Sequence, residues 1–446
     1  MLSRRKTTPI LAGVLGGLLT SVVIGNWQRN RPNVVMIVVD SMRADAVSEV
    51  LGSAVTPNLR SLIDEGVQFP TAFTHSSETV AAHAALYSGM NPYQLGITGD
   101  ARQVDDRVPL LAETLRDHGY QTAAAIGLAD LWQPEYGEGL ARGFQRFEQG
   151  EHAVEGATQV GQRLTSILDG FDPNESFFLL ANFADLHEPY QDKGPTAHRA
   201  RVLVDDRMVD ELAISRNCFW NHRLVLSPGD HTLEFASDIG IRVRELAVRG
   251  PGGELPYELR VGGFDGSSER IMMSLTNPTD DELVVELDAW IHDSPSLQEL
   301  RDRYVSEIET VDHAIGELMT ELKWRGLYDD TIIIVTSAHG AALGEHDSIG
   351  HDANLYDEVL NVPLIVRLPA AWDEHALLIE NTPEVVRLVD VAPTILELCQ
   401  IPEWDGMAGQ SLLCEAKRPL IAQSIEPRAA TASFAMRDAR YKMTYV

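Results

Sequence analysis

The chain is poor in cysteine and in basic residues. Its three cysteines, Cys218, Cys399 and Cys414, show no metal-ligand spacing, and their odd number excludes a complete disulfide framework. We expect three buried thiols, with one optional bridge between Cys399 and Cys414 in an oxidising compartment. Acidic residues outnumber basic ones by 66 to 36, which gives a formal charge of −30. Such an acidic surface repels phosphates and therefore argues against nucleic acid as a partner.

One long uncharged segment stands near the N-terminus. Residues 7–28 carry no charge and are mostly apolar, and residues 4–6 before them are basic. The length suits a single membrane-spanning helix whose basic flank stays in the cytoplasm. A cleaved signal peptide is the alternative, because the run is short and rich in glycine. We predict an anchor or signal peptide over residues 1–31. The remainder then lies outside the cytoplasm, membrane-anchored (periplasmic or extracellular) or secreted.

Short apolar runs and amphipathic helices alternate over most of the remaining chain. Helices are predicted from Thr56 to Asp64 and from Leu297 to Leu322. Buried strands are predicted at Val34–Val39, Thr122–Ile126, Phe177–Asn182, Thr331–Thr336 and Leu364–Val366. This order indicates an α/β fold with a mainly parallel sheet sandwiched by helices. Ligands of such sheets collect beyond the carboxyl ends of the strands.

An all-β insert interrupts the alternation. Short strands and turn signals dominate from about residue 196 to residue 293. We predict an inserted, sandwich-like subdomain over 196–296, between two parts of one α/β domain at 32–195 and 297–446. A structural spacer or lid is the simpler role, and binding of a carbohydrate or another partner is the alternative.

Polar residues that suit a catalytic site follow the predicted strands. Asp40 ends one apolar strand, and His339 follows another. A carboxylate in such a place is costly unless it is paired or binds a metal. Thr79 stands at or near the N-terminus of a helix rich in small residues, where backbone N–H groups favour an anion. Asp185 and His187 follow a third strand.

His351, in a loop after His339, completes the set. Each of these residues alone has an ordinary structural explanation, but their convergence on one edge of the sheet predicts a site.

At this point the chain resembles the sulfatase family of the alkaline phosphatase superfamily. The motifs that carry the resemblance, in the order of the family, are NVVMIVVDSMRAD, TPNLRSLIDEGVQF, the stretch from Thr79 to Gly89, DLHEPY, RGLYDDTIIIVTSAHG, GHDANLYDEVLNVPLIV, LVDVAPTILELCQIP and the MRDARYK close. The resemblance implies an alkaline-phosphatase-like fold. It also implies cleavage of sulfate or phosphate esters by a metal-bound nucleophile through a covalent intermediate.

The resemblance also implies roles for individual residues. Thr79 corresponds to the nucleophile, and His187 and His351 to positions that hold substrate oxygens or a second metal. His83 falls where formylglycine sulfatases have the Arg of their modification motif, so it is predicted to bind substrate. The resemblance makes Asp40, Thr79 and His339 ligands of a divalent ion (Zn, Mn or Ca). From their own segment, Asp185 and His187 could bind a second such ion, or His187 could hold an oxyanion while Asp185 orients it.

Two positions depart from the family pattern. The stretch from Thr79 to His83 offers no Cys or Ser to convert, which excludes a formylglycine mechanism and favours direct use of Thr79. Ala338 stands where relatives have a metal-binding Asp before the His.

Two functions follow from this pattern. The first is a metal-dependent hydrolase or transferase of phosphate or sulfate esters, with glycans, lipids or envelope polymers as substrate classes. The alternative is a catalytically impaired relative with a binding or structural role.

Overall fold

The computed structural model describes most of the chain after residue 30. The described residues are 31–446 without 48–55, 98–103, 129–137, 151–153, 188–197, 215–217, 251–252, 255–256, 262–267, 278, 294–296, 352–353, 373–377, 379–383, 415–418, 427–430 and 446. The predicted anchor or signal peptide therefore lies outside them, apart from residue 31. Among the described helices, none has the length and apolar character needed to cross a membrane.

The chain divides into two compact units. The first comprises Met1–Ala184, Glu309–Ala342 and His351–Val446, and the second comprises Asp185–Ile308 and Leu343–Gly350. Each unit has its own sheet, and each is described separately below.

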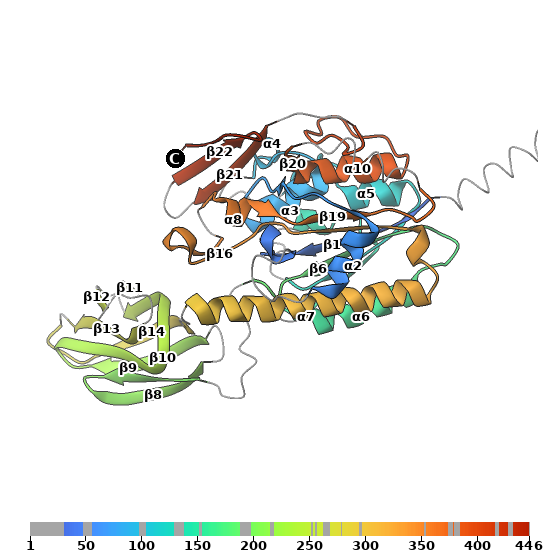
Figure 1. Cartoon of the computed structure of the whole chain (residues 1–446). Coiled ribbons are helices and arrows are strands. Elements are labelled where there is room, and N and C mark those ends of the chain that lie inside the picture. The colour runs from blue at the N-terminus through green and yellow to red at the C-terminus, as the bar shows by residue number, and fades with distance from the viewer. Residues whose placement is uncertain are drawn as a thin grey trace, which may run out of the picture. The chain divides into compact units, whose positions relative to one another are not determined.

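The first unit is built on a seven-stranded mixed sheet in the order β2-β19-β15-β1-β6-β4-β5 (Figure 1). The strands are β1 (Asn33–Val39), β2 (Val67–Gln68), β4 (Gln121–Ile126), β5 (Arg146–Gln149), β6 (Phe177–Phe183), β15 (Thr331–Thr336) and β19 (Leu364–Arg367). Strand β1 is central and pairs in parallel with β15 and with β6. The predicted strands are all present, but β19 runs antiparallel to β15, so the sheet is mixed.

Burial on both faces explains the continuous apolar runs of the central strands. All seven residues of β1 are buried, and the six from Val34 to Val39 are 0% exposed. Each such side chain contributes about 1.5–3 kcal/mol relative to an exposed one. Val34, Met36 and Val38 pack in one core cluster with residues of α3, α5 and α10.

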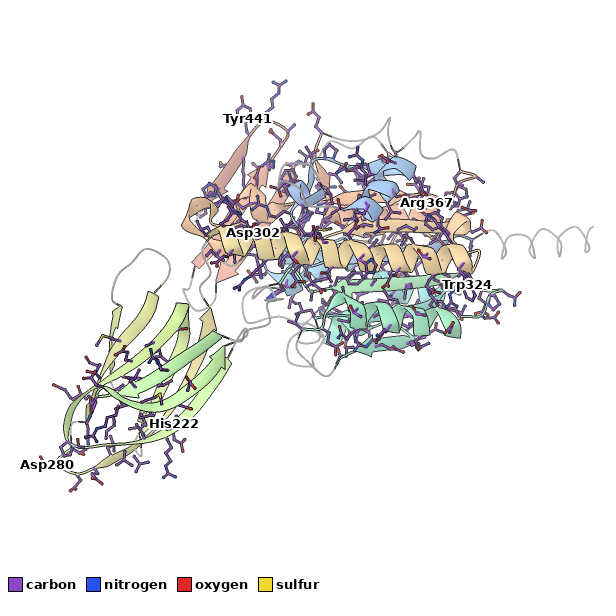
Figure 2. All side chains as sticks on the ribbon, turned by 60° about the horizontal axis from the view of Figure 1, so that its bottom comes forward. His222, Asp280, Asp302, Trp324, Arg367 and Tyr441 are labelled. Carbon is purple, nitrogen blue, oxygen red and sulfur yellow. The ribbon has the colours of Figure 1, made fainter. Side chains whose placement is uncertain are left out.

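Helices cover the two faces of this sheet (Figure 1). They are α2 (Pro57–Glu65), α3 (Thr79–Ser88), α5 (Leu111–Asp117), α6 (Ala157–Gly170), α7 (Leu297–Trp324) and α10 (Val391–Leu398), with the short α4 (Pro92–Leu95) and α8 (Asp357–Leu360). Helix α2 is joined to α7 because the backbone N–H groups of Asn58 and Leu59 donate to the carboxylate of Asp312. Helix α7 ends before Gly326, whose φ of +68° suits a residue without Cβ. Trp324 near that end is 79% exposed (Figure 2).

Smaller sheets complete the first unit. They are the three-stranded sheets β18-β3-β20 (Asn361–Val362, Ala72–Phe73, Val386–Arg387) and β21-β22-β23 (Leu420–Glu426, Thr431–Arg437, Lys442–Tyr445). Strands β16 (Ala342–Leu343) and β17 (Ile349–Gly350) form a separate pair, and all of it except Ala342 belongs to the second unit.

The second unit carries an eight-stranded antiparallel sheet (Figure 1). Its strands are β7 (His198–Val204), β8 (Arg207–Ile214), β9 (Cys218–Leu226), β10 (Gly229–Gly250), β11 (Gly253–Glu254), β12 (Tyr257–Val261), β13 (Ser268–Asn277) and β14 (Leu283–Asp293). The long strand β10 pairs with β7 along its first part and with β14 along its second part.

The cysteine predictions need a correction. Cys399 is buried as expected, but Cys414 is exposed and both are free thiols, so the optional bridge between them is absent. Burial raises the pKa of the Cys399 thiol to about 12, which keeps it protonated. The side chain of Cys218 lies outside those described.

Candidate active site

The first site residue, Asp40, follows the central strand β1 directly. Its backbone N–H donates to the carbonyl oxygen of Phe183, at 2.8 Å, so it continues the pairing between β1 and β6. Ser41 then adopts a φ of +63° and turns the chain away. A non-glycine residue in this left-handed region costs about 1–3 kcal/mol, and such strain is concentrated at functional sites.

Helix α3 supplies the candidate nucleophile. Thr79 is the first residue of the helix, and Glu78, rather than Thr79, is the N-cap. Residues 81–88 are all buried, and four of them are alanines that allow close packing against the neighbouring elements. Thr79 itself is half-buried. Its hydroxyl thus stands at the end of the helix where the backbone N–H groups lack partners within the helix.

Thr79 and His339 meet although 260 residues separate them. The distance between Thr79 Oγ1 and His339 Nε2 is 3.0 Å. The other ring nitrogen, Nδ1, lies 3.0 Å from the carbonyl oxygen of Gly340 and must donate, because a carbonyl only accepts. In the neutral ring Nε2 is therefore the acceptor, and the Thr79 hydroxyl donates to it. This is the arrangement in which an imidazole activates a hydroxyl nucleophile.

His351 lies beside this pair. Its ring stacks on the ring of His339, with centroids 4.0 Å apart and planes at 28°. Its Nδ1 donates to the carbonyl oxygen of Ser77 at 2.8 Å, which ties it to the segment that leads into α3. The first unit thus brings together Thr79 with His339 and His351, from two distant parts of the sequence.

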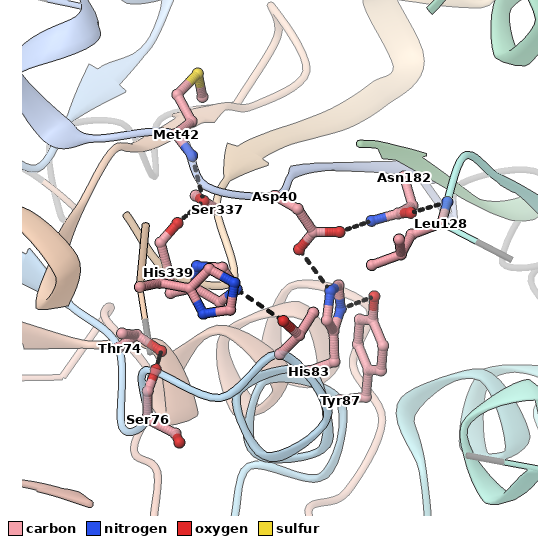
Figure 3. A network of polar contacts seen from close by, with 12 residues as sticks. Asp40, Met42, Thr74, Ser76, His83, Tyr87, Leu128, Asn182, Ser337 and His339 are labelled. Carbon is pink, nitrogen blue, oxygen red and sulfur yellow. Dashed lines mark hydrogen bonds and ion pairs between the residues drawn. The ribbon is translucent and has the colours of Figure 1, made fainter. Parts of the chain in front are cut away.

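Asp40 belongs to a second, fully buried set of contacts (Figure 3). His83 Nε2 donates to Asp40 Oδ1 and Asn182 Nδ2 donates to Asp40 Oδ2, each at 2.8 Å. On the far side of the His83 ring, Nδ1 lies 2.8 Å from the Tyr87 hydroxyl. Burial alone would raise the pKa of Asp40, but the charge and hydrogen bond of His83, with smaller contributions from His339 and Asn182, lower that pKa to about 2.

Helical spacing explains why one short helix serves both sets. Thr79, His83 and Tyr87 are each four residues apart, so they lie on one face of α3 in successive turns. His83 is 0% exposed and both its nitrogens are engaged. In this structure the His83 ring contacts Asp40 and Tyr87, and its predicted role in substrate binding remains a prediction.

Hydrogen bonds hold the strand ends in register. Ser337 Oγ accepts from the backbone N–H of Met42 at 3.1 Å and donates to the carbonyl oxygen of His339 at 2.5 Å (Figure 3). Arg43 donates to the carbonyl oxygen of Ala341 at 3.1 Å and pairs with Asp45. These contacts join the loop after β1 to the loop after β15 and so position His339.

The predicted metal centre does not fit the described side chains. Both oxygens of Asp40 accept hydrogen bonds from His83 and Asn182, and Ala338 offers no donor atom. In the part of the chain that the structure describes, no group of three His, Cys, Asp or Glu side chains is arranged to hold an ion. A divalent cation needs several oxygen or nitrogen ligands, and an Asp40 carboxylate already bonded to imidazole and amide groups is poorly suited to it.

Asp185 and His187 belong to the second unit, close to its boundary with β6. Asp185 is 4% exposed and His187 is half-buried. Their predicted roles, metal binding for Asp185 and catalysis or substrate binding for His187, remain predictions.

Three polar residues of this region were missed by sequence reasoning. Asn182 is the only amide in the apolar run of β6, and a buried polar residue there is a usable signal for a partner. Tyr87 could have been found from its spacing of four from His83. Ser337 offered no comparable signal, because its contacts depend on how two distant loops pack.

The α/β fold with its mixed sheet defines a class, the proteins of alkaline-phosphatase-like fold. The phosphonate monoester hydrolase of Agrobacterium radiobacter has a similar structure, with a TM-score of 0.59 and 19% identity over 93% of this chain and 87% of that one. A structure solved in complex with D-glucosamine-2-N,6-O-disulfate as substrate has a TM-score of 0.57 and 17% identity over 93% of this chain and 88% of that one.

Within that class the chain belongs to the sulfatase family, whose model, described as Sulfatase, matches residues 32–401. N-acetylglucosamine-6-O-sulfatase of Bacteroides thetaiotaomicron is 24% identical over 86% of this chain and 71% of that protein. Choline-sulfatase of Rhizobium meliloti is 23% identical over 93% of this chain and 78% of that protein. The resemblance predicted from the motifs is confirmed, and by its family the chain is a sulfate ester hydrolase.

Proposed function

We propose that this chain cleaves a sulfate, phosphate or phosphonate ester with Thr79 as nucleophile and His339 as its general base. The observation that carries the proposal is the 3.0 Å contact between Thr79 Oγ1 and His339 Nε2 at the first residue of α3. A hydroxyl is a weak nucleophile until a neighbouring base accepts its proton, and the Gly340 carbonyl oxygen fixes the His339 ring in the form that can do so.

The proposed reaction has two steps and begins with attack by Thr79. Thr79 Oγ attacks the sulfur or phosphorus atom and passes its proton to His339 Nε2. The new bond from Oγ forms as the ester bond to the leaving oxygen breaks, and the proton on His339 is then available to the leaving alcohol. Water, or an acceptor alcohol in a transferase, releases the group from Thr79 in the second step.

The surroundings of Thr79 favour an anionic group. The N-terminus of α3 directs backbone N–H groups and the positive end of the helix dipole toward it. Ser77, two residues before Thr79, has a buried hydroxyl with no hydrogen-bond partner among the described residues. A substrate oxygen or a water molecule would satisfy such a group. His351, stacked on His339, would then steady the developing charge.

Relatives narrow the substrates to test. Two of them are named for sulfate esters of N-acetylglucosamine and of choline, and one structural neighbour for phosphonate monoesters. We propose a sulfated glycan as the first natural substrate class. His187 remains a candidate for binding it, and the location outside the cytoplasm remains part of the proposal.

The test measures p-nitrophenol release from p-nitrophenyl sulfate, phosphate and phenylphosphonate, together with sulfate release from 6-O-sulfated glucosamine. Thr79→Ala should lower turnover by about 10³-fold or more, because the nucleophile is lost. Thr79→Ser keeps a hydroxyl and is the matched control, which should retain measurable turnover. Intact mass spectrometry after acid quenching should show a sulfo or phospho group on the wild-type chain but not on Thr79→Ala.

The alternative is a sulfatase-fold protein that binds an anion without cleaving its ester. Ala338 and the engaged Asp40 favour it. Sulfate binding with neither turnover nor an adduct on Thr79, across the whole substrate panel, would overturn the hydrolase proposal in favour of this alternative.

A further inference from the structure

The buried side chains around Asp40 form a continuous series of polar contacts. Tyr87, His83, Asp40 and Asn182 follow one another at 2.8 Å per contact. Asp40 and His83 are both 0% exposed, so the hydrogen bond between their carboxylate and imidazole lies away from water. A buried carboxylate without such a partner would be strongly destabilising.

Ala338 lies at the strand end beside Asp40, where relatives have a second carboxylate. Val38 of β1 pairs with Thr336 of β15 in parallel register. Asp40 and Ala338 each lie two residues further on, at neighbouring strand ends, and Ala338 is 0% exposed. A carboxylate at residue 338 would therefore be buried close to Asp40, where two carboxylates repel each other unless a cation lies between them or one of them takes up a proton. With alanine at residue 338 only one carboxylate is left, and His83 is its partner.

We propose that His83 takes the place of a divalent ion in this chain, so that the site keeps its shape and acts on its ligand without a metal. Only one part of this proposal, that the site acts on a ligand, rests on the function proposed above. The claim about metal concerns the Asp40–His83 pair and stands or falls on binding measurements. His83 here is a positioning residue, because it contacts Asp40 and not the group that Thr79 would attack.

The pair also supports the nucleophile through helix α3. His83 lies one helical turn after Thr79, and its bond to Asp40 ties α3 to the end of β1. His339, whose loop is held to the residues after β1 through Ser337, approaches the same turn from β15. Fixing α3 to β1 thus fixes the distance between Thr79 and His339.

The first experiment needs no variant. The full chain is purified, its metal content is measured, and its melting temperature is recorded with EDTA and with excess Ca²⁺, Mg²⁺, Mn²⁺ or Zn²⁺. We expect substoichiometric metal and a melting temperature that neither EDTA nor any of the four ions changes. A stoichiometric ion that EDTA removes, with a fall in melting temperature, would overturn the proposal.

The second experiment rebuilds the site that the proposal says was lost. Ala338→Asp alone should lower the melting temperature by several degrees, because His83 cannot compensate a second buried carboxylate. The double variant Ala338→Asp with His83→Ala should gain an EDTA-reversible rise in melting temperature with one of the four ions. The matched control combines Ala338→Asn with His83→Ala, which has the same size without the charge, and should gain none.

The outcomes separate the two proposals. A double variant that folds but gains no ion overturns the assignment of His83 to the place of a metal. If the variants fail to fold, the wild-type measurements still decide. Failure of the proposed function would appear as absent turnover and absent Thr79 adduct, which neither metal content nor melting temperature reports.

Discussion

The chemistry of this protein depends on which atoms each histidine contacts. His339 has one nitrogen on a backbone carbonyl oxygen and the other on the Thr79 hydroxyl. His83 has one nitrogen on a carboxylate and the other beside a phenol. The same residue type therefore has two roles, a base beside the candidate nucleophile and a buried partner of Asp40.

At the level of single residues, His339→Gln should lower ester turnover by about 10²–10⁴-fold, the range that general base catalysis supplies. The amide keeps much of the size of the ring but cannot take the proton from Thr79. The measurement is p-nitrophenol release under saturating substrate. His313→Gln is the control, since the side chain of His313 is 78% exposed on α7, and it should leave turnover unchanged. Equal turnover of the His339 variant and wild type would contradict the role of His339.

Among the elements, α3 and β10 each carry a histidine with polar contacts at both ring nitrogens. Helix α3 lines up a hydroxyl, an imidazole and a phenol by its period alone. At the start of β10, His231 Nδ1 lies 2.7 Å from Asp205 Oδ2, and Nε2 lies 2.7 Å from the carbonyl oxygen of Ser227. Both acceptors lack a hydrogen to give, so both ring nitrogens donate and the ring is an imidazolium.

The ion pair between His231 and Asp205 predicts how the melting temperature depends on pH. Burial acts to lower the pKa of His231, but the hydrogen bonds to Asp205 and the Ser227 carbonyl raise it above 6.5. Because the folded pKa exceeds the unfolded one, the stabilisation is complete below about pH 6.5 and is lost as pH rises through the folded value. At the acid end, Asp205 must stay ionised; burial acts to raise its pKa, but the bond to His231 lowers it below its ordinary value, so the stabilisation is lost only as pH falls through that lowered pKa.

His231→Gln should therefore cost about 1 kcal/mol of unfolding free energy near pH 6, and less at alkaline pH. Melting curves recorded across this range measure it. His313→Gln is the control, because the side chain of His313 is 78% exposed, and we expect a smaller, flatter effect. A cost for His231→Gln that grows with pH would contradict the ionised pair.

At the scale of the whole molecule, two features of the full sequence affect its behaviour. One is the net charge of −30, which favours solubility and makes nucleic acid an unfavourable partner. The other is the apolar segment at residues 7–28, which lies outside the described residues.

We expect the full chain to sediment with membranes in the cells that produce it. A chain that lacks residues 1–31 should remain in the supernatant, because it loses the segment long enough to span a bilayer. Fractionation with detection of both forms, followed by protease added from outside, measures location and orientation together. Release of the full chain as a shorter soluble form would indicate a cleaved signal peptide, and a full chain that stays in the cytoplasm would contradict both interpretations.

Much of the first unit could be predicted from the sequence because its signals are local. The run from Thr331 to Thr336 forms β15 with the predicted bounds, since β-branched residues buried on both faces leave little alternative. Helix α7 follows the apolar spacing from Leu297 to Leu322. The direction of β19 was not predictable in this way, because antiparallel and parallel central strands share the same apolar pattern.

By itself the sequence determined the family, the strands that end in polar residues, and the residue types available for chemistry, because motif order and hydrophobic period are properties of short segments. Only the tertiary structure decided which of those residues meet. Sequence reasoning assigned Asp40 and His339 to one metal, whereas packing joins Asp40 to His83 and His339 to Thr79. Contacts between residues 43 and 260 positions apart depend on the packing of α3 against the ends of β1 and β15, and no local pattern encodes that packing.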